Sequence, residues 1–128
     1  MNTHYIEIGN NDWGVLLCYD YDFRDEDSIW ALCRSFGLSK KKTQEAISII
    51  MQPNTGMTIS NNELRMSVVF IGDATSAGQF WDSVAHESIH VCQAILDFYG
   101  ESWDGEVPAY LDGYLFRKIV STIGVPCR

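Results

Sequence analysis

The sequence has few basic residues, and this shortage excludes one large class of partner. Only 9 lysines and arginines stand against 17 aspartates and glutamates, which gives a formal net charge of -8 at pH 7. Such a surface repels phosphate groups, so we expect no nucleic-acid partner. The one basic run, Lys40 to Lys42, is typical of a solvated helix face.

Long apolar runs and paired cysteines are also lacking. No stretch reaches the ~20 apolar residues of a membrane span, and the first residues lack the pattern of a signal peptide. The 4 cysteines show no C-x-x-C spacing, and buried free thiols are typical of a reducing cytosol. We therefore expect a cytoplasmic protein with no membrane partner; the oligomeric state is unknown from the sequence.

What is present indicates one globular domain over residues 1–128. Apolar side chains make up 46% of the chain, and no linker, repeat or low-complexity tract interrupts it. Aromatic and β-branched residues predict strands within 4–21 and 56–71, and Asn61-Asn62 predicts a tight turn in the second pair. The fold class that we predict is α+β, a small antiparallel or mixed sheet packed against helices.

Helix caps and stops delimit the helices that we expect over 25–37, 39–53, 76–100 and 107–123. The third is the dominant element, because Ser76 and Gln79 form a capping-box pattern and Gly100 suits a left-handed cap. Its apolar residues occupy more than one stripe, which predicts a central helix covered on several sides.

This central helix carries the H-E-x-x-H pattern of zinc hydrolases at His86, Glu87 and His90. Residues one turn apart share a helix face, so both imidazoles can reach one ion at ~2.0 to 2.1 Å. A carboxylate beside the first ligand can accept a proton from water that the metal has acidified. We therefore predict a Zn2+ cofactor held by the two histidines, with Glu87 as the catalytic base. His4 lies far away in a predicted strand and is expected to be structural or exposed.

A catalytic zinc needs three protein ligands and one open position, and no histidine follows at the metzincin spacing. The best candidate for the third ligand is Glu106, at the head of the last helix. A short loop can fold that helix antiparallel against the motif helix, and the small Ala109 allows a close approach. Glu101, Asp104 and Asp112 remain alternatives.

Further residues lie near this face by helical arithmetic. Asp97, on the stripe begun by the histidines, or a backbone carbonyl can hold the other ring nitrogen of a ligand histidine. Tyr110, with Tyr114 as second choice, can offer a phenol to the oxyanion as a catalytic residue, although such tyrosines commonly pack. Cys92 lies beside the motif, and its helix face points to the core.

With H-E-x-x-H on one helix and a glutamate opening the next, residues 64–110 resemble the gluzincin clan of zinc peptidases, in particular the minigluzincins. The stretches HESIHVCQAILDFYG and GEVPAYLDGYLF are also similar to short metallopeptidases encoded in phages and prophages. The resemblance implies a zincin-like fold, zinc on His86, His90 and Glu106, and catalysis by Glu87. It also implies that 64–71 lines the cleft and binds peptide by strand addition.

We therefore expect a zinc-dependent peptidase whose substrate is a peptide or protein. One alternative is a metal-binding interaction module without turnover. Glu87 argues against it, because a purely structural zinc site has no use for a base. Another alternative is a zinc hydrolase acting on a non-peptide amide, which the sequence does not separate from a peptidase.

Overall fold

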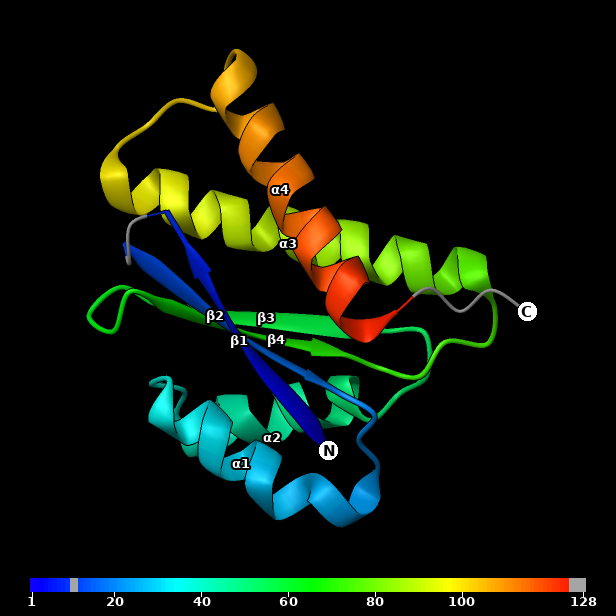
Figure 1. The fold of residues 1–128 in the computed structure, drawn as a ribbon. Helices are drawn as coiled ribbons and strands as arrows, with labels where there is room; N and C mark the ends of the chain where they lie inside the picture. The colour runs from blue at the N-terminus through cyan, green and yellow to red at the C-terminus, as the bar shows by residue number, and fades with distance from the viewer. Residues whose placement is uncertain (10–11, 125–128) are drawn as a thin grey trace.

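A computed structural model describes residues 1–9 and 12–124 of the chain and shows an α+β fold in three layers (Figure 1). The helices α1 and α2 cover one face of a central sheet, and α3 and α4 cover the other. The elements are β1 (Asn2–Ile8), β2 (Trp13–Tyr19), a 3-10 turn (Phe23–Asp25), α1 (Glu26–Ser35), α2 (Lys40–Ile50), β3 (Gly56–Asn61), β4 (Met66–Ile71), α3 (Ala77–Tyr99) and α4 (Glu106–Ile123).

The sheet is mixed and 4-stranded, with the order β1-β2-β4-β3. The outer pairs β1/β2 and β3/β4 are antiparallel, and the inner pair β2/β4 is parallel, with Leu17 opposite Val69. The prediction of a small mixed sheet from 4–21 and 56–71 is therefore confirmed. The strand β3 is an edge strand, which matters for the site described below.

Each face of the sheet has its own apolar core, because successive strand residues point to opposite faces. Val15 and Leu17 of β2 pack toward α3 and α4, whereas Cys18 packs toward α1 and α2. In β4, Val68 and Phe70 contact the second core and Val69 the first. An inner strand buried on both faces needs an unbroken apolar run, and residues 68–71 supply it.

The predicted helix boundaries are confirmed where a cap defines them. The Ser39 hydroxyl accepts a hydrogen bond from the Lys42 amide, and the Ser76 hydroxyl accepts one from the Gln79 amide, both at 3.1 Å. Gly100 ends α3 in the left-handed conformation, with φ 66°. The long α3 lies between the sheet and α4, as its several apolar stripes predict.

The predicted tight turn at Asn61-Asn62 is wrong. Asn61 is the last residue of β3, the turn takes residues 62–65, and the positive φ of 50° falls on Arg65. The Asn61 side chain explains the longer turn, because its oxygen accepts the Leu64 amide at 2.9 Å and its nitrogen donates to the Phe36 carbonyl at 3.1 Å. The asparagine therefore anchors the turn from the strand end.

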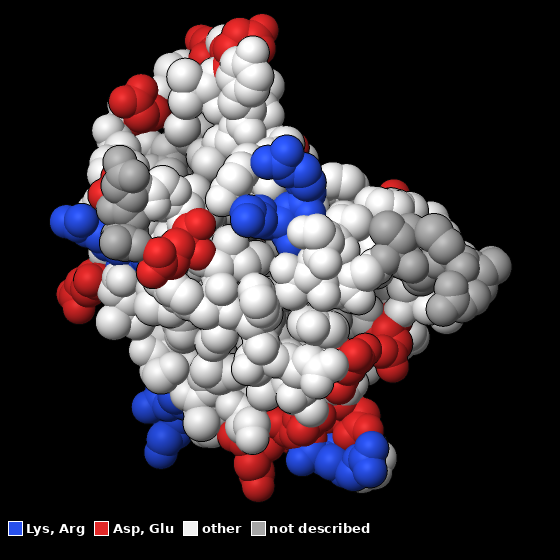
Figure 2. All heavy atoms as spheres, viewed as in Figure 1, with Lys and Arg blue, Asp and Glu red and all other residues white. Residues whose placement is uncertain are grey.

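Cys18, Cys33 and Cys92 are free and buried, as expected, and Cys127 lies outside the described residues. Burial raises the pKa of Cys18 and Cys92 to about 12 and that of Cys33 to about 11. Within the described ranges, no helix is both long and apolar enough to cross a membrane. On the face that Figure 2 shows, basic side chains form small separate groups among scattered acidic ones.

Candidate metal and catalytic site

The two histidines of the motif lie on the exposed side of α3 and face each other. The Nε2 atoms of His86 and His90 are 3.0 Å apart, and their ring centroids are 4.7 Å apart. Two nitrogen ligands bound to one tetrahedral zinc at ~2.0 to 2.1 Å stand ~3.3 Å from each other. The imidazoles therefore already have nearly the separation that a shared ion requires.

The other ring nitrogen of His90 is held by a residue that the sequence analysis did not single out. The Oε1 atom of Gln93 lies 3.1 Å from His90 Nδ1, so Nδ1 carries the proton when this amide oxygen accepts it. That tautomer turns the Nε2 lone pair of His90 toward His86. Asp97, predicted for this role, lies one turn further along, exposed to solvent and without a side-chain hydrogen bond to the described residues. The i, i+3 spacing of Gln93 from His90 was the signal for this contact.

Glu87 lies between α3 and β3 and is only 3% exposed. Its Oε1 atom accepts a hydrogen bond of 2.9 Å from the hydroxyl of Thr58 on β3. Burial raises the pKa of Glu87, and the Thr58 hydrogen bond and the two histidines oppose that rise. A carboxyl group so placed is more easily protonated than a solvated one, as a group that must accept a proton requires.

Gly56 makes the position of Glu87 possible. A Cβ atom at Gly56 would lie 2.7 Å from Glu87 Cγ and 2.9 Å from Oε2, closer than carbon atoms normally approach. The carboxylate therefore uses space that any other residue at the start of β3 would occupy. Because Gly56 and Thr58 belong to a strand about thirty residues upstream, helical spacing gave no signal for either contact.

Two cavities adjoin these side chains and follow β3. One has a volume of about 290 Å³ and includes Asn54, Thr55 and Asp82, and the other, of about 350 Å³, includes Met57, Thr58 and Ser60. The two cavities share three lining residues, Gly56, His86 and Glu87. We call the two together the β3 cleft.

The strand that borders this cleft is not the predicted one. Residues 66–71 form β4, which is hydrogen-bonded to β2 on one side and to β3 on the other, and 64–65 lie in the turn. An inner strand has no free edge to offer a peptide. The parallel pairing of β2 with β4 puts β3 at the edge, so β3 takes the place that we expected 64–71 to occupy.

Glu106 is not brought to the histidines in this structure. It is the first residue of α4, it is exposed, and α4 crosses α3 with its first turns projecting away from the sheet (Figure 1). The helix α4 contacts α3 on the side away from the histidines, where Asp112 accepts a hydrogen bond of 3.0 Å from Ser88. Ser88 stands ~200° around the helix from His86 at 3.6 residues per turn. Across residues 1–9 and 12–124, no group of at least 3 His, Cys, Asp or Glu side chains is placed to hold a metal ion.

The remaining candidates also lie apart from the β3 cleft. Glu101 and Asp104 belong to the exposed connection between α3 and α4, and Asp112 is half-buried against Ser88. Tyr110 is 74% exposed and contributes to a different cavity on α4, together with Tyr114. His4 is exposed on β1, and Cys92 is buried in the core, both as expected.

The donor set therefore fits part of a catalytic zinc site. Two imidazoles and a buried carboxylate are in place, and the third protein ligand is not supplied within the described residues in this arrangement. Comparison with protein-family models, with curated proteins and with solved structures finds no match.

Proposed function

We propose that the protein is a zinc-dependent peptidase with a zincin-like fold. The observation that carries the proposal is the approach of His86 Nε2 to His90 Nε2, at 3.0 Å, beside the buried carboxylate of Glu87. Chance placement of two histidines on a helix does not require the glutamate between them to be buried against a neighbouring strand. Such burial raises the pKa of the carboxyl group, which suits a residue that acts as a base.

In this proposal His86 and His90 hold the ion, which when bound acidifies a water molecule and polarises a carbonyl group. Glu87 would be the carboxylate that accepts a proton during hydrolysis and returns it to the leaving amine. Thr58 orients the carboxylate by donating to Oε1, which leaves Oε2 available. Gln93 fixes the tautomer of His90.

Glu106 is the third ligand in this proposal, although it lies apart from the histidines in the structure. Its carboxylate reaches them only if the first turn of α4 moves toward the β3 cleft. The connection 100–105, exposed throughout, is where such a movement would take place. Tyr110 would move with the same turn, since it lies one helical turn from Glu106.

The substrate that we propose is an extended segment of a peptide or protein. Among the described strands β3 pairs with β4 alone, so its outer edge can bind such a segment beside Glu87. Free, buried cysteines are in keeping with a cytoplasmic protein. A non-peptide amide remains an alternative substrate, and a metal-binding interaction module without turnover is the second candidate function.

Zinc titration and cleavage of a peptide library test the proposal together. We expect about one zinc per chain, lost in the His86→Ala/His90→Ala double variant. Glu87→Gln should keep the zinc and the fold but abolish cleavage, because an amide cannot accept the proton. Glu45→Gln, an exposed change on α2, is the matched control and should cleave like wild type. Full zinc occupancy in the double variant contradicts the site, and zinc binding without any cleavage by wild type favours the interaction module.

The third ligand has its own test in the same titration. Glu106→Ala should weaken zinc binding strongly and lower the stability of the zinc-bound protein by about 1.4 kcal/mol for each tenfold loss of affinity, which is seen as a lower melting temperature. Asp104→Ala, two residues earlier in the exposed connection, tests an alternative ligand and should leave zinc binding nearly unchanged. If both variants bind zinc like wild type, Glu106 is not a ligand.

A further inference from the structure

The sheet contains a topological switch point between its two inner strands. From β2 the chain turns to α1 on one face, whereas from the neighbouring parallel strand β4 it turns to α3 on the other face (Figure 1). The two connections therefore separate at the carboxyl ends of β2 and β4. In open α/β sheets, ligands bind in the crevice that such a separation leaves.

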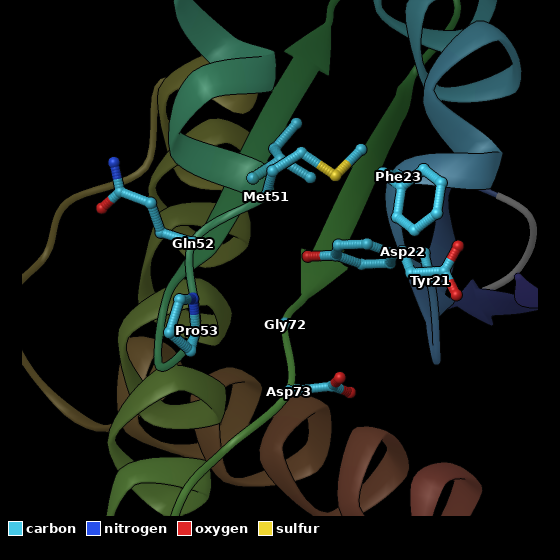
Figure 3. A pocket seen from close by; sticks show the side chains of 9 residues that line it. Tyr21, Asp22, Phe23, Met51, Gln52, Pro53, Gly72 and Asp73 are labelled. Atoms are coloured by element: carbon cyan, nitrogen blue, oxygen red, sulfur yellow. The ribbon is translucent and has the colours of Figure 1, made fainter.

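A cavity of about 360 Å³ lies at this point (Figure 3). Its walls come from the connection after β2 (21–23), the end of α2 with its turn (50–53) and the connection after β4 (72–73). Its volume is within the range of small-molecule sites, ~300 to 1,000 Å³. It shares no lining residue with the β3 cleft, so it is a separate site that does not depend on the proposed function. We call it the switch-point cavity.

Tyr21 supplies an unpartnered polar atom to this cavity. The residue is 7% exposed, and its hydroxyl has no hydrogen-bond partner within residues 1–9 and 12–124. The phenol points from its ring toward Gly72, and a Cβ atom at Gly72 would lie 3.4 Å from the hydroxyl oxygen (Figure 3). Burial raises the pKa of Tyr21, so the group stays a neutral hydroxyl. A buried hydroxyl without a partner is unfavourable, and a polar ligand atom in the cavity would supply the missing hydrogen bond.

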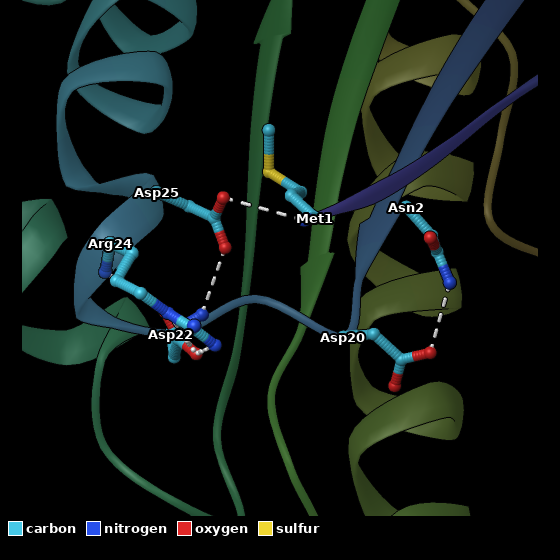
Figure 4. A network of polar contacts seen from close by, with 6 residues as sticks. All are labelled: Met1, Asn2, Asp20, Asp22, Arg24 and Asp25. Atoms are coloured by element: carbon cyan, nitrogen blue, oxygen red, sulfur yellow. Dashed lines mark hydrogen bonds and ion pairs between the residues drawn. The ribbon is translucent and has the colours of Figure 1, made fainter.

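The charged residues around the cavity indicate which charge that ligand carries. Two aspartates line it and no basic residue does. Asp22 is neutralised by Arg24 at 2.6 Å, and the adjacent Asp25 pairs with the amino group of Met1, as Figure 4 shows. The carboxylate of Asp73 has no hydrogen-bond or ion-pair partner among the described residues. An unneutralised carboxylate beside a buried hydroxyl favours a cation that can donate hydrogen bonds.

The rest of the cavity wall is apolar. Ile50, Met51 and Pro53 line one side, and Phe23, which is 77% exposed, lies near the opening. A flexible methionine thioether beside an exposed aromatic ring suits a hydrocarbon or aromatic stem.

We propose that the switch-point cavity binds a primary ammonium group carried on an apolar stem. The ammonium donates to the Tyr21 hydroxyl oxygen and to the Asp73 carboxylate, and the stem packs on Met51 and Phe23. Two sources carry this chemistry: a free alkyl or arylalkyl amine, and the side chain of a lysine in a peptide.

Calorimetric titration of the full chain with phenethylamine, in the presence of EDTA to exclude metal, tests the first source. A peptide with one central lysine, acetylated and amidated at its ends, tests the second. Phenethyl alcohol and 3-phenylpropionate are the neutral and anionic controls. We expect at least one amine to bind, and both controls to bind more weakly by about tenfold or more.

Variants then assign the binding to this cavity. Tyr21→Phe and Asp73→Asn should each weaken amine binding by about tenfold, whereas the matched changes Tyr5→Phe on β1 and Glu45→Gln on α2 should not. Tyr21→Phe removes only an unpartnered hydroxyl, so the variant keeps its fold, which the melting curve checks. Failure of both amines to bind, equal binding of the alcohol, or amine affinity unchanged in Tyr21→Phe each overturns the proposal.

Discussion

Adding a methyl group at Gly56 tests how closely the Glu87 side chain packs against β3. In Gly56→Ala the new Cβ would lie 2.7 Å from Glu87 Cγ, 2.9 Å from its Oε2 and 2.9 Å from the carbonyl oxygen of Phe70. Replacing glycine by alanine at a compatible position stabilises a protein by about 0.4 to 1 kcal/mol, and overpacking costs about 1 to 3 kcal/mol. With contacts this short, we expect a net loss of about 1 to 2 kcal/mol.

Differential scanning calorimetry without metal reads this loss as a melting temperature lower by roughly 4 to 8 °C. Gly113→Ala is the matched control, because a Cβ atom at Gly113 in α4 meets nothing within 4 Å. That variant should gain up to about 1 kcal/mol from better helix propensity.

A double-mutant cycle separates Glu87 from the backbone contact. In a Glu87→Ala background the Cγ and carboxylate atoms are absent, so Gly56→Ala should be less destabilising by about 1 kcal/mol, while the clash with the Phe70 carbonyl persists. If Gly56→Ala has the same melting temperature as wild type, or lowers the free energy of unfolding equally in both backgrounds, the carboxylate does not occupy the space beside Gly56.

Two further predictions concern groups away from the β3 cleft. Thr43, 0% exposed in α2, has a hydroxyl without a hydrogen-bond partner in the part of the chain that the structure describes. Thr43→Val should therefore raise the free energy of unfolding by about 1 kcal/mol, measured by urea denaturation. A fall in stability, or no change, would mean that the hydroxyl finds a partner in solution. The pKa of the Cys18 thiol is raised from 9.0 to about 12, so above pH 9 the unfolded thiol loses its proton while the folded one keeps it. Stability should therefore fall as the pH rises from 9 toward 12, by up to about 1.4 kcal/mol per unit for this thiol, and Cys18→Ala should lessen that slope. An identical slope in the variant would refute the burial argument.

Features that depend on a few neighbouring residues were predictable from the sequence. The caps at Ser39 and Ser76 each involve a hydroxyl and the amide three residues on, and Gly100 needs only its own backbone freedom. The approach of His86 and His90 is of the same kind, since one helical turn brings them together whatever surrounds the helix.

Features that depend on long-range packing were not predictable. The order of the strands follows from the pairing of β2 with β4, which no local pattern encodes. Because of this order, the strand that borders the cleft is β3 and not the predicted segment 64–71. The path of α4 depends on contacts such as that between Asp112 and Ser88, so the expected meeting of Glu106 with the histidines did not follow from loop length. The anchors of Glu87, Thr58 and Gly56, are likewise set by how α3 lies on the sheet.

The parallel pair at the centre of the sheet also governs the order in which the chain can fold. The hydrogen bond from Trp13 to Ser67 joins residues 54 positions apart, and closing a loop of that length costs roughly 3.5 kcal/mol in chain entropy. On a ribosome, β1, β2, α1 and α2 emerge before β4, and until it arrives β2 lacks its inner neighbour. The helices α1 and α2 then have only part of a sheet to pack on. The sheet is therefore incomplete until β4 arrives, and a chain released before Ile71 lacks a strand that contributes to both cores.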